Sequence, residues 1–541
     1  MKKITTTVFL LCMILSGVYS AQDIYVSPSG DDLNAGTQES PYATLAKATS
    51  MVSEDGAVIH VTAGTYVFSS TAIIKPYDQT IAGANAATTI LDGNNAVALI
   101  DGITEFDNSQ KILTISNVAL KNAKYTGSTG VTTGGSAIRM GFKTNLNLDH
   151  CYFYKNASVN GGVNCSAGAI YFAGNNISVN SCFFEENSNT GTGSTAPGGA
   201  ITVLLTTATN GATNALVKNS SFYKNSSVGR GAAIYFNRLY NTSDPDDNAT
   251  FVVQNCVFLE NAATATVGFG AAVMLSSGGA NGTLLVKRTS IIMTNNTIID
   301  NYSTNAGAPT NQNGVYFEGF MYESYMANNI VICEKTETGF SLLANQTTSP
   351  EYGMNNIIDL KSTQIDGADF NADAVVKNNV VTATTADAVG VSKTLSGYPI
   401  SGDSFSVPYL TISAGSAVNA GTNSYLVNTI ANPAPATPVE YVLQTDILGF
   451  SRVNSRDLGA YETSISTSMK NTTIQSYTII SDNQGIRILG LMKNDKLNVY
   501  NSNGCLLYNE SVNQTEIQVP ISTAGIYIIS VNGKAGKYIH N

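Results

Sequence analysis

Few residues in this sequence have the types and spacing that a catalytic centre needs. The chain has three histidines, His60, His150 and His540, and no Trp. Elimination from an acidic glycan requires a base that removes the proton beside a uronate carboxylate, and a cation or basic side chain that neutralises the acid. Arg139, Lys143 and His150 are close enough in sequence to be candidates. Simpler interpretations are a solvated surface charge for Arg139 and, for His150, a substitution in a turn position that other repeats fill with Ser or Asn.

Tyrosines recur at one position of a repeated strand and suggest binding. Tyr171, Tyr235 and Tyr316 occupy this position, which Arg139, Thr202 and Met274 fill in other repeats. Rings on a flat sheet can stack on the apolar faces of sugars or contact a host protein. Tyrosine also simply suits an exposed parallel sheet, and the absence of Trp weakens the case for a glycan.

Two oxygen-rich segments are candidate Ca²⁺ sites. One contains Asp244, Asp246, Asp247 and Asn248, and the other contains Asp31, Asp32 and Asn34. Neither has the spacing of a calcium loop, so turn formation explains both. We therefore expect no cofactor, with Ca²⁺ a candidate only if the protein is a lyase. A polygalacturonase-like hydrolase would place several aspartates near a Gly-His-Gly, and no histidine here lies in such a motif.

The composition excludes several classes of protein. Of the 541 residues only 12% are charged, against roughly 25% in ordinary globular domains, which argues against coiled coils and helical bundles. The formal net charge of −10 does not suit a nucleic-acid binder. At 43% hydrophobic, with 27 Tyr and 19 Phe, the chain has ample material for a core, so extensive disorder is excluded.

Two short patterns alternate from about residue 112 to residue 318. One is a Gly/Ala-rich entry into a strand, as in GGSAIRM, AGAIYF, GGAITV, GAAIYF and GAAVML. The other is a strand, a polar turn and a closing asparagine, at Asn156, Asn187, Asn225, Asn261 and Asn301, with a looser earlier copy that closes at Asn122. The patterns keep their length while the spacers vary, as in a solenoid whose loops leave one side. Two short strands per repeat, bounded by Gly and Asn, predict an all-β fold in which short parallel strands wind into a β-helix.

Alternation along the strands assigns inward columns that should stack at the spacing of neighbouring strands. The predicted inward residues are Ile138/Met140, Ile170/Phe172, Ile201/Val203, Ile234/Phe236, Val273/Leu275 and Val315/Phe317 in the first pattern, with Phe153, Phe184, Phe222, Phe258 and Ile298 in the second. The repeated asparagines should form amide ladders in the turns. Cys151 and Cys182 occupy equivalent positions, and we favour stacked thiols over a disulfide because their side chains point in parallel.

The two ends of the chain differ from the repeats. Residues 1–20 have Lys2 and Lys3, an apolar run and small residues before Ala21, which indicates a cleaved secretory signal. An amphipathic helix around residues 41–52 would cap the β-helix of residues 21–463. Residues 464–541 show short alternating strands and predict a small β-sandwich. No stretch after the signal is long and apolar enough to span a membrane.

Several motifs resemble known families. FYKN at Phe153, FEEN at Phe184, FYKN at Phe222 and FLEN at Phe258 resemble the repeats of chlamydial-type polymorphic outer membrane proteins and, more widely, right-handed β-helix proteins of the pectate-lyase-like superfamily. LTISAGSAVNAG at Leu410 and TDILGFSRVNSRDLGAYE at Thr445 resemble the end of choice-of-anchor Q proteins. NVYNSNGCLLY at Asn498 and AGIYIISVNGK at Ala524 are similar to the C-terminal sorting domain of the type IX secretion system.

These resemblances imply an exported protein of a Gram-negative, Bacteroidota-type bacterium. The type IX secretion machinery would be one partner, and the last module would be removed as the product is released or fixed to the cell surface. The expected function is adhesin-like binding of a surface glycan or a host protein. The alternatives are a polysaccharide lyase acting on an acidic glycan and a structural component of a surface layer.

Overall fold

The computed structural model divides the chain into two compact units, Met1–Thr463 and Ser464–Asn541. It describes residues 21–127, 134–159, 167–191, 197–205, 213–238, 249–264, 270–277, 289–304, 312–319, 323–335, 340–345, 351–359, 380–381, 384–397, 400–401, 404–413, 415–421, 426–427, 439–440, 444–449, 451–452, 456–462, 478–482, 485–501, 506–521, 525–532 and 534–540. Within these ranges, no helix has the length and apolar character needed to cross a membrane.

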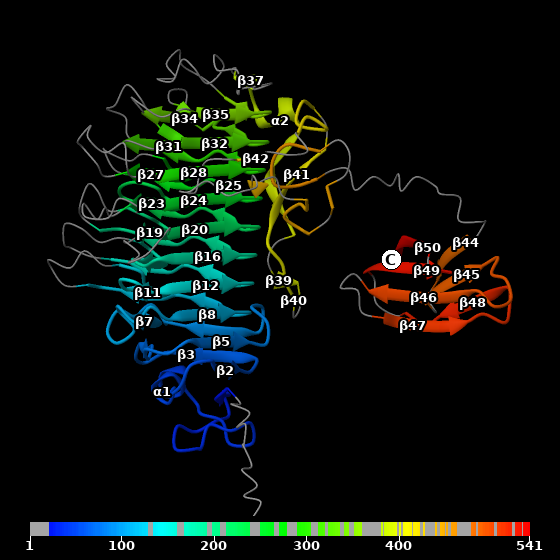
Figure 1. Cartoon of the computed structure of the whole chain (residues 1–541), viewed down its shortest axis with the longest axis horizontal. Helices are drawn as coiled ribbons and strands as arrows, with labels where there is room; N and C mark the ends of the chain where they lie inside the picture. The colour runs from blue at the N-terminus through cyan, green and yellow to red at the C-terminus, as the bar shows by residue number, and fades with distance from the viewer. Residues whose placement is uncertain are drawn as a thin grey trace, which may run out of the picture. The chain divides into compact units, whose positions relative to one another are not determined.

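The first unit is the expected right-handed parallel β-helix, and its strands stack in register along the rod (Figure 1). Sheet A contains β1 (Asp23–Val26), β2 (Ala57–Val61), β5 (Gln79–Gly83), β8 (Ile112–Ser116), β12 (Asn145–Asp149), β16 (Asn176–Asn180), β20 (Thr213–Lys218), β24 (Ala249–Gln254), β28 (Thr289–Thr294), β32 (Glu323–Ala327) and β35 (Glu351–Met354). Sheet B contains β3 (Gly64–Val67), β6 (Thr89–Asp92), β9 (Ala119–Lys121), β13 (Tyr152–Tyr154), β17 (Phe183–Glu185), β21 (Ser221–Tyr223), β25 (Val257–Leu259), β29 (Thr297–Ile299), β33 (Ile330–Ile332), β36 (Ile357–Ile358) and β37 (Val380–Val381).

Two further sheets complete each coil. Sheet C contains β4 (Ala72–Ile73), β7 (Ile100–Gly102), β11 (Ile138–Met140), β15 (Ile170–Phe172), β19 (Ile201–Leu205), β23 (Ile234–Arg238), β27 (Val273–Ser277), β31 (Gln312–Gly319) and β34 (Phe340–Asn345). Sheet D contains the two-residue strands β10 (Lys124–Tyr125), β14 (Ala157–Ser158), β18 (Ser188–Asn189), β22 (Ser226–Ser227), β26 (Ala262–Ala263) and β30 (Tyr302–Ser303).

The prediction of two strands per repeat is therefore wrong, because a full coil has four strands and the second pattern alone contains two, joined by two residues of which one is left-handed. His150, Ser181, Asn219 and Asn255 all take this conformation, with φ of 51° in each case. A single residue with positive φ turns the chain from sheet A into sheet B without a loop, and the short side chains of Asn and Ser suit such a position.

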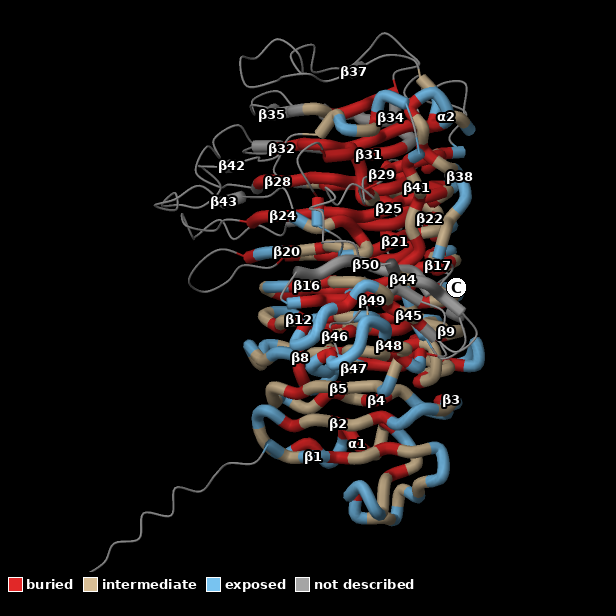
Figure 2. The backbone as a smooth tube through the Cα atoms, turned by 90° about the vertical axis from the view of Figure 1, so that its right-hand side faces the viewer, coloured by how far each residue is buried: buried red, intermediate tan, exposed pale blue. Residues whose placement is uncertain are grey.

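The inward columns are confirmed. All the first-pattern residues assigned to the core are at most 1% exposed. The rings of Phe153, Phe184, Phe222 and Phe258 stack with centroid separations of 4.6, 4.8 and 4.8 Å and interplanar angles of at most 5°. Figure 2 shows the resulting buried interior along the coils.

Asparagine ladders are also present. The Nδ2 groups of Asn156, Asn187, Asn225 and Asn261 each donate to the Oδ1 of the next asparagine in the file, at 2.9, 2.9, 2.9 and 2.7 Å. Each amide also meets backbone groups of neighbouring coils; Asn225, for example, donates to Phe184 O and accepts from Asn187 N. The ladder thus satisfies polar groups that would otherwise be buried without partners.

The cysteines at equivalent positions are free thiols, as favoured from the sequence. Cys151, Cys182 and Cys256 are fully buried and unbridged. Burial raises the pKa of the Cys256 thiol to about 12, and burial is likewise the main cause that raises the pKa of Cys182. These thiols act as small apolar core residues.

Helix α1 (Leu45–Ser50) covers the first coil and is shorter than predicted. Thr44 is its N-cap and accepts from Lys47 N, while Leu45 and Ala48 face the core. At the other end, residues 384–462, here called the return segment, fold back along the side of the β-helix as far as β13, where Phe405 lies against Tyr152 (Figure 1). Its elements are α2 (Ala386–Val389), β38 (Val391–Ser396), β39 (Ile400–Ser401), β40 (Ser404–Phe405), β41 (Tyr409–Ile412), β42 (Leu426–Val427) and β43 (Val439–Glu440).

The second unit has two antiparallel sheets around its own core. One sheet has the order β44 (Thr478–Asp482), β45 (Gly485–Leu489), β48 (Glu516–Val519), and the other has the order β47 (Leu506–Ser511), β46 (Lys496–Asn501), β49 (Gly525–Val531), β50 (Lys534–His540). The short alternating strands expected in residues 464–541 are therefore confirmed, with GIRIL in β45, KLNVY in β46 and GIYIISV in β49.

Candidate ligand-binding site

The outward column of sheet C carries the predicted tyrosines, but their rings are not exposed. Tyr171, Tyr235 and Tyr316 are 4%, 8% and 5% exposed. Tyr235 and Tyr316 pack with Met274 in a small apolar cluster, and Tyr171 packs with Ala167 and Ala173 in another. The expectation of an exposed tyrosine platform is therefore wrong, because strand alternation tells which way a side chain points and not what covers it.

A polar cluster occupies the same column nearer the N-terminus, and Arg139 is at its centre. Its strand neighbours in the column are Asp101 on β7 and Tyr171 on β15. Arg139 Nη1 lies 3.2 Å from Asp101 Oδ2, and the guanidinium lies 4.3 Å from the ring centroid of Tyr125 on β10. The side chains of Arg139 and Asp101 are 14% and 10% exposed. The guanidinium is thus fixed by a carboxylate and by an aromatic face.

The remaining members of the cluster are Tyr171 and Asp107. Asp101 Oδ1 accepts from the backbone N–H of Ile103 at 2.6 Å, which holds the carboxylate in place. Burial raises the pKa of Tyr171 to about 12, the charge of Arg139 opposes this shift, and the charge of Asp107 adds to it. We call Asp101, Asp107, Tyr125, Arg139 and Tyr171 the Arg139 cluster.

The glycine at position 141 makes room for one carboxylate of the Arg139 cluster. A Cβ atom at Gly141 would lie 2.2 Å from Asp107 Oδ1. Asp107 Oδ1 is buried without a hydrogen-bond partner among the described residues, whereas Oδ2 accepts from Asn108 Nδ2. With two carboxylates and one guanidinium, the Arg139 cluster offers fixed donors and acceptors and no net positive charge. This arrangement suits ligand hydroxyl groups better than a ligand carboxylate.

The structure does not bring the three candidate lyase residues together. Arg139 lies on sheet C, Lys143 lies in the turn that follows β11, and His150 lies beyond the far end of β12. A five-residue strand such as β12 spans about 17 Å. His150 Nδ1 is 2.9 Å from Asp149 Oδ2, and its side chain is 52% exposed. His150 therefore belongs to the left-handed turn column.

The metal candidates receive no support from the described residues. Asp244, Asp246 and Asp247 lie outside them. Asp32 instead accepts from Ala43 N, Thr44 N and Thr44 Oγ1 at 3.0, 2.9 and 2.7 Å, so it supports the start of α1. In the described part of the chain, no group of three or more His, Cys, Asp or Glu side chains could hold a metal ion.

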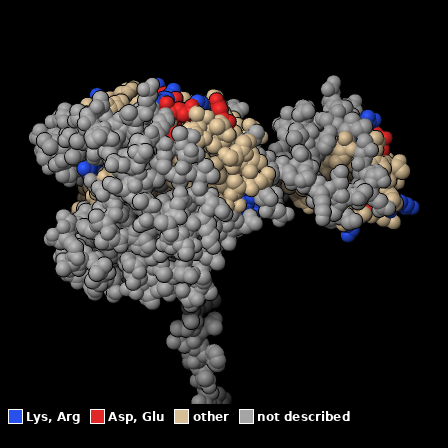
Figure 3. Space-filling view, turned by 90° about the horizontal axis from the view of Figure 1, so that it is seen from above, with Lys and Arg blue, Asp and Glu red and all other residues tan. Residues whose placement is uncertain are grey.

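Alternating charges follow another turn column, between sheets B and D. Lys155, Glu186, Lys224 and Glu260 all have positive φ. Lys155 Nζ lies 3.5 Å from Glu186 Oε2, and Lys224 Nζ lies 3.7 Å from Glu260 Oε2. Lys224 also lies over the ring of Tyr223 at 4.8 Å, and its interaction with this phenol is the main cause that raises its pKa. Seen from above, acidic and basic side chains lie next to one another along one margin of the molecule (Figure 3).

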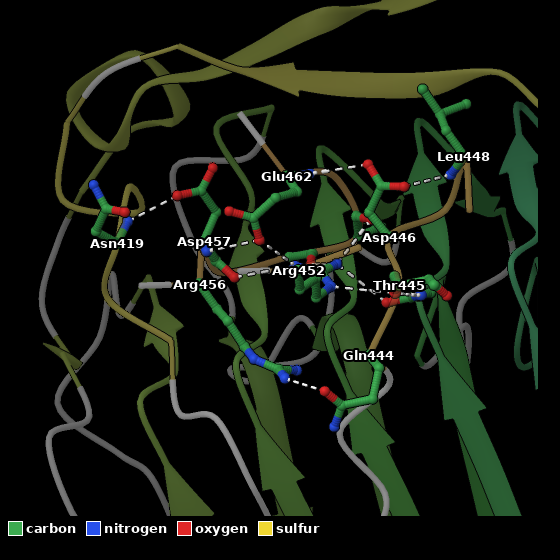
Figure 4. Close-up of polar contacts among 12 residues, drawn as sticks. Asn419, Gln444, Thr445, Asp446, Leu448, Arg452, Arg456, Asp457 and Glu462 are labelled. Atoms are coloured by element: carbon green, nitrogen blue, oxygen red, sulfur yellow. Dashed lines mark hydrogen bonds and ion pairs between the residues drawn. The ribbon is translucent and has the colours of Figure 1, made fainter. Parts of the chain in front are cut away.

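A buried polar network lies at the end of the return segment, and the sequence patterns do not predict it. Arg452 and Glu462 have fully buried side chains, with Arg452 Nη1 3.3 Å from Glu462 Oε2. Arg452 Nη2 donates to Asn255 Oδ1 at 3.1 Å and to the carbonyl of Gly459 at 2.8 Å. Figure 4 shows Arg452 among the acidic side chains of Asp446 and Glu462. The motif TDILGFSRVNSRDLGAYE therefore fastens the return segment to the turn column of the β-helix.

Comparisons with known proteins add little to this geometry. No family model matches the chain, and no curated protein matches it. Among solved structures, the chain is similar to "The complex structure of XylC with xylose", with a TM-score of 0.33 and 11% identity over 82% of this chain and 98% of that one. It is also similar to "Glycoside hydrolase" (TM-score 0.33, 12% identity, 67% and 96%) and "Rhamnogalacturonan lyase" (TM-score 0.25, 13% identity, 67% and 87%). Similarities this distant do not bear on function.

Proposed function

We propose that this protein is an exported β-helix binding protein, displayed on the cell surface or released, that holds a hydroxyl-rich glycan at the Arg139 cluster. The observation that carries the glycan part is the ion pair of Arg139 with Asp101 on the outer face of sheet C, with the guanidinium stacked on Tyr125. Side chains fixed in this way lose little conformational freedom when a ligand binds.

A binding role fits these residues better than the alternative, a lyase. A lyase needs a base and a positive charge that converge on one uronate. Arg139 precedes β12 and His150 follows it, so the two residues lie toward opposite ends of this strand. In addition, Asp101 already neutralises the charge of Arg139. An acidic substrate would have to displace Asp101 or bind next to two carboxylates.

Binding to immobilised neutral and acidic glycans tests this role. We expect retention of neutral glycans, weakened about tenfold or more in Arg139→Met because the variant loses the donors and leaves Asp101 without its partner. Lys143→Met is a matched control that removes a nearby cation outside the cluster and should bind normally. Unchanged retention in Arg139→Met, or unsaturated uronates released from an acidic glycan, would contradict the proposal.

Export is tested separately. The signal at residues 1–20 and the sorting-like module at residues 464–541 support it. Mass spectrometry of surface and culture proteins should find a mature species that begins near Ala21 and lacks the last module. A mature species with an intact C-terminus would exclude the sorting role.

A further inference from the structure

A cavity of about 350 Å³ lies at the N-terminal end of the β-helix, between α1 and β3. Both elements lie at the same end of the rod (Figure 1). Asp32, Thr44 and Lys47 line one wall, and residues 65–70 line the other. This volume is within the range of about 300–1,000 Å³ that is typical of ligand sites.

One wall of this cavity is an unpaired strand edge. β3 is the terminal strand of sheet B and pairs with β6 only. Gly64 N donates to Thr88 O at 2.7 Å, and Phe68 N donates to Asp92 O at 2.8 Å. Because backbone groups alternate in direction along a parallel strand, those of Thr65 and Val67 point away from β6. Among the described residues, no backbone hydrogen bond to them is found.

The cap leaves this edge open while it covers its neighbours. In sheet A, the edge strand β1 pairs with the loop between β1 and α1, here called the cap loop. Tyr25 N donates to Gly36 O and Tyr42 N donates to Tyr25 O, both at 2.9 Å. In sheet C, α1 packs against β4. At β3 the cap loop approaches the start of the strand, where a Cβ on Gly64 would lie 2.2 Å from Pro28 Cγ, and no backbone hydrogen bond joins the cap loop to β3 among the described residues.

The opposite wall is rigid and carries the cation of Lys47 together with the hydrogen-bonded carboxylate of Asp32. The three hydrogen bonds to Asp32 fix the backbone that precedes α1. Lys47 Nζ lies 5.5 Å from the ring centroid of Tyr42 and has no ion pair with any described carboxylate. An acidic group in the cavity would therefore find a cation that is not held in an ion pair with a described carboxylate.

We propose that this cavity binds an extended peptide that carries an acidic side chain. The peptide adds to sheet B along the edge of β3, where Thr65 and Val67 present alternating donors and acceptors over about 7 Å. One side chain of the peptide enters the cavity and places its carboxylate near Lys47. A sugar suits the lining less well, because Tyr66 and Phe68 are buried and present no exposed ring for stacking.

Fluorescence anisotropy tests this inference with purified protein and the fluorescein-labelled, C-terminally amidated tripeptide Val-Glu-Val. Val67→Pro removes one free edge N–H and leaves the pairing with β6 intact, because proline is tolerated at strand edges. We expect Val67→Pro to weaken binding about threefold to tenfold, the effect of one hydrogen bond, and Val67→Thr to bind normally. If Val67→Pro unfolds, a probe N-methylated at its Glu tests the same backbone pairing with the wild-type protein.

The charge is tested with the probe Val-Gln-Val. Wild type and Lys47→Arg should prefer the Glu probe, whereas Lys47→Met should bind the two probes equally. Equal affinity of wild type and Val67→Pro, or no binding of the Glu probe at millimolar concentration, would overturn the proposal. Light scattering shows whether the protein associates with itself. Self-association that is abolished by Val67→Pro and is not reversed by the probe would identify a second copy of the chain as the occupant, and this result would also overturn the proposal.

Discussion

Replacing Arg452 by Met tests whether the buried ion pair holds the return segment on the β-helix. All the guanidinium nitrogens of Arg452 have partners: Nε donates to Thr445 O at 3.3 Å, and Nη1 and Nη2 bond to Glu462, Asn255 and backbone carbonyls. Burial lowers the pKa of Arg452 and the charge of Glu462 opposes this shift, so the pair shares one desolvated environment. Arg452→Met keeps much of the volume but leaves Glu462 buried without its cation, which costs about 3–5 kcal/mol.

Urea unfolding followed by far-ultraviolet circular dichroism measures this loss, and hydrogen exchange of residues 444–462 locates it. Lys75→Met is a matched control in the same unit, because the Lys75–Glu105 pair is 29% and 42% exposed and should contribute about 1 kcal/mol or less. The double variant Arg452→Met, Glu462→Leu removes the stranded carboxylate and should recover much of the loss. If the double variant is as unstable as Arg452→Met, or if exchange of the return segment does not change, the buried-charge argument is wrong.

Two further predictions concern the interior of the β-helix. Asn225→Ala leaves Phe184 O and Asn187 N without the partners that Asn225 supplies, and it should lower the free energy of unfolding measured in urea by about 2–4 kcal/mol. Asn176 Nδ2 donates to Asn145 Oδ1 at 2.9 Å in an exposed hydrogen bond, so the control Asn176→Ala should cost about 1 kcal/mol or less, and equal losses would contradict the ladder argument. The pKa of the Cys256 thiol is about 12 in the folded protein and about 8.5 in the unfolded chain. The stability associated with the protonated thiol is therefore fully present below about pH 8.5 and is lost as the pH rises toward about 12. The urea concentration at the unfolding midpoint should therefore decrease as the pH is raised from about 8.5 to about 10.5. The decrease should be less steep in Cys256→Ala, and the same slope in both proteins would refute ionisation of Cys256 as its cause.

The sequence predicts the interior of this fold well because stacking repeats like residues at like positions. The Phe153, Phe184 and Phe222 file follows directly from the repeated motif, and so does the free-thiol state of Cys151 and Cys182. The extra strand boundary is hidden because one left-handed residue forms it, and its type varies from His150 to Asn219.

Contacts between distant segments are not visible in a single sequence. The alternation places Tyr171 and Tyr235 outward, but it does not show that their rings pack against neighbours such as Ala173 and Met274 and are buried. Arg452 and Glu462 lie in a motif that the sequence shows, yet Asn255, which accepts a hydrogen bond from Arg452, is nearly two hundred residues earlier. Likewise, the ion pair of Arg139 with Asp101 can be predicted only when it is known which coils are neighbours.

The attachment of the return segment has a mechanical consequence. Gly459 N donates to Asn328 O at 2.7 Å and Ala460 N donates to Thr297 Oγ1 at 3.0 Å, so the chain leaves this unit from the side of the rod. Tension applied at residue 462 would enter at those inner coils and load these contacts in shear. The terminal coil would then lie outside the path of the force. Because a stacked array separates most easily at its last coil, the β-helix would resist unfolding from that end when it is pulled.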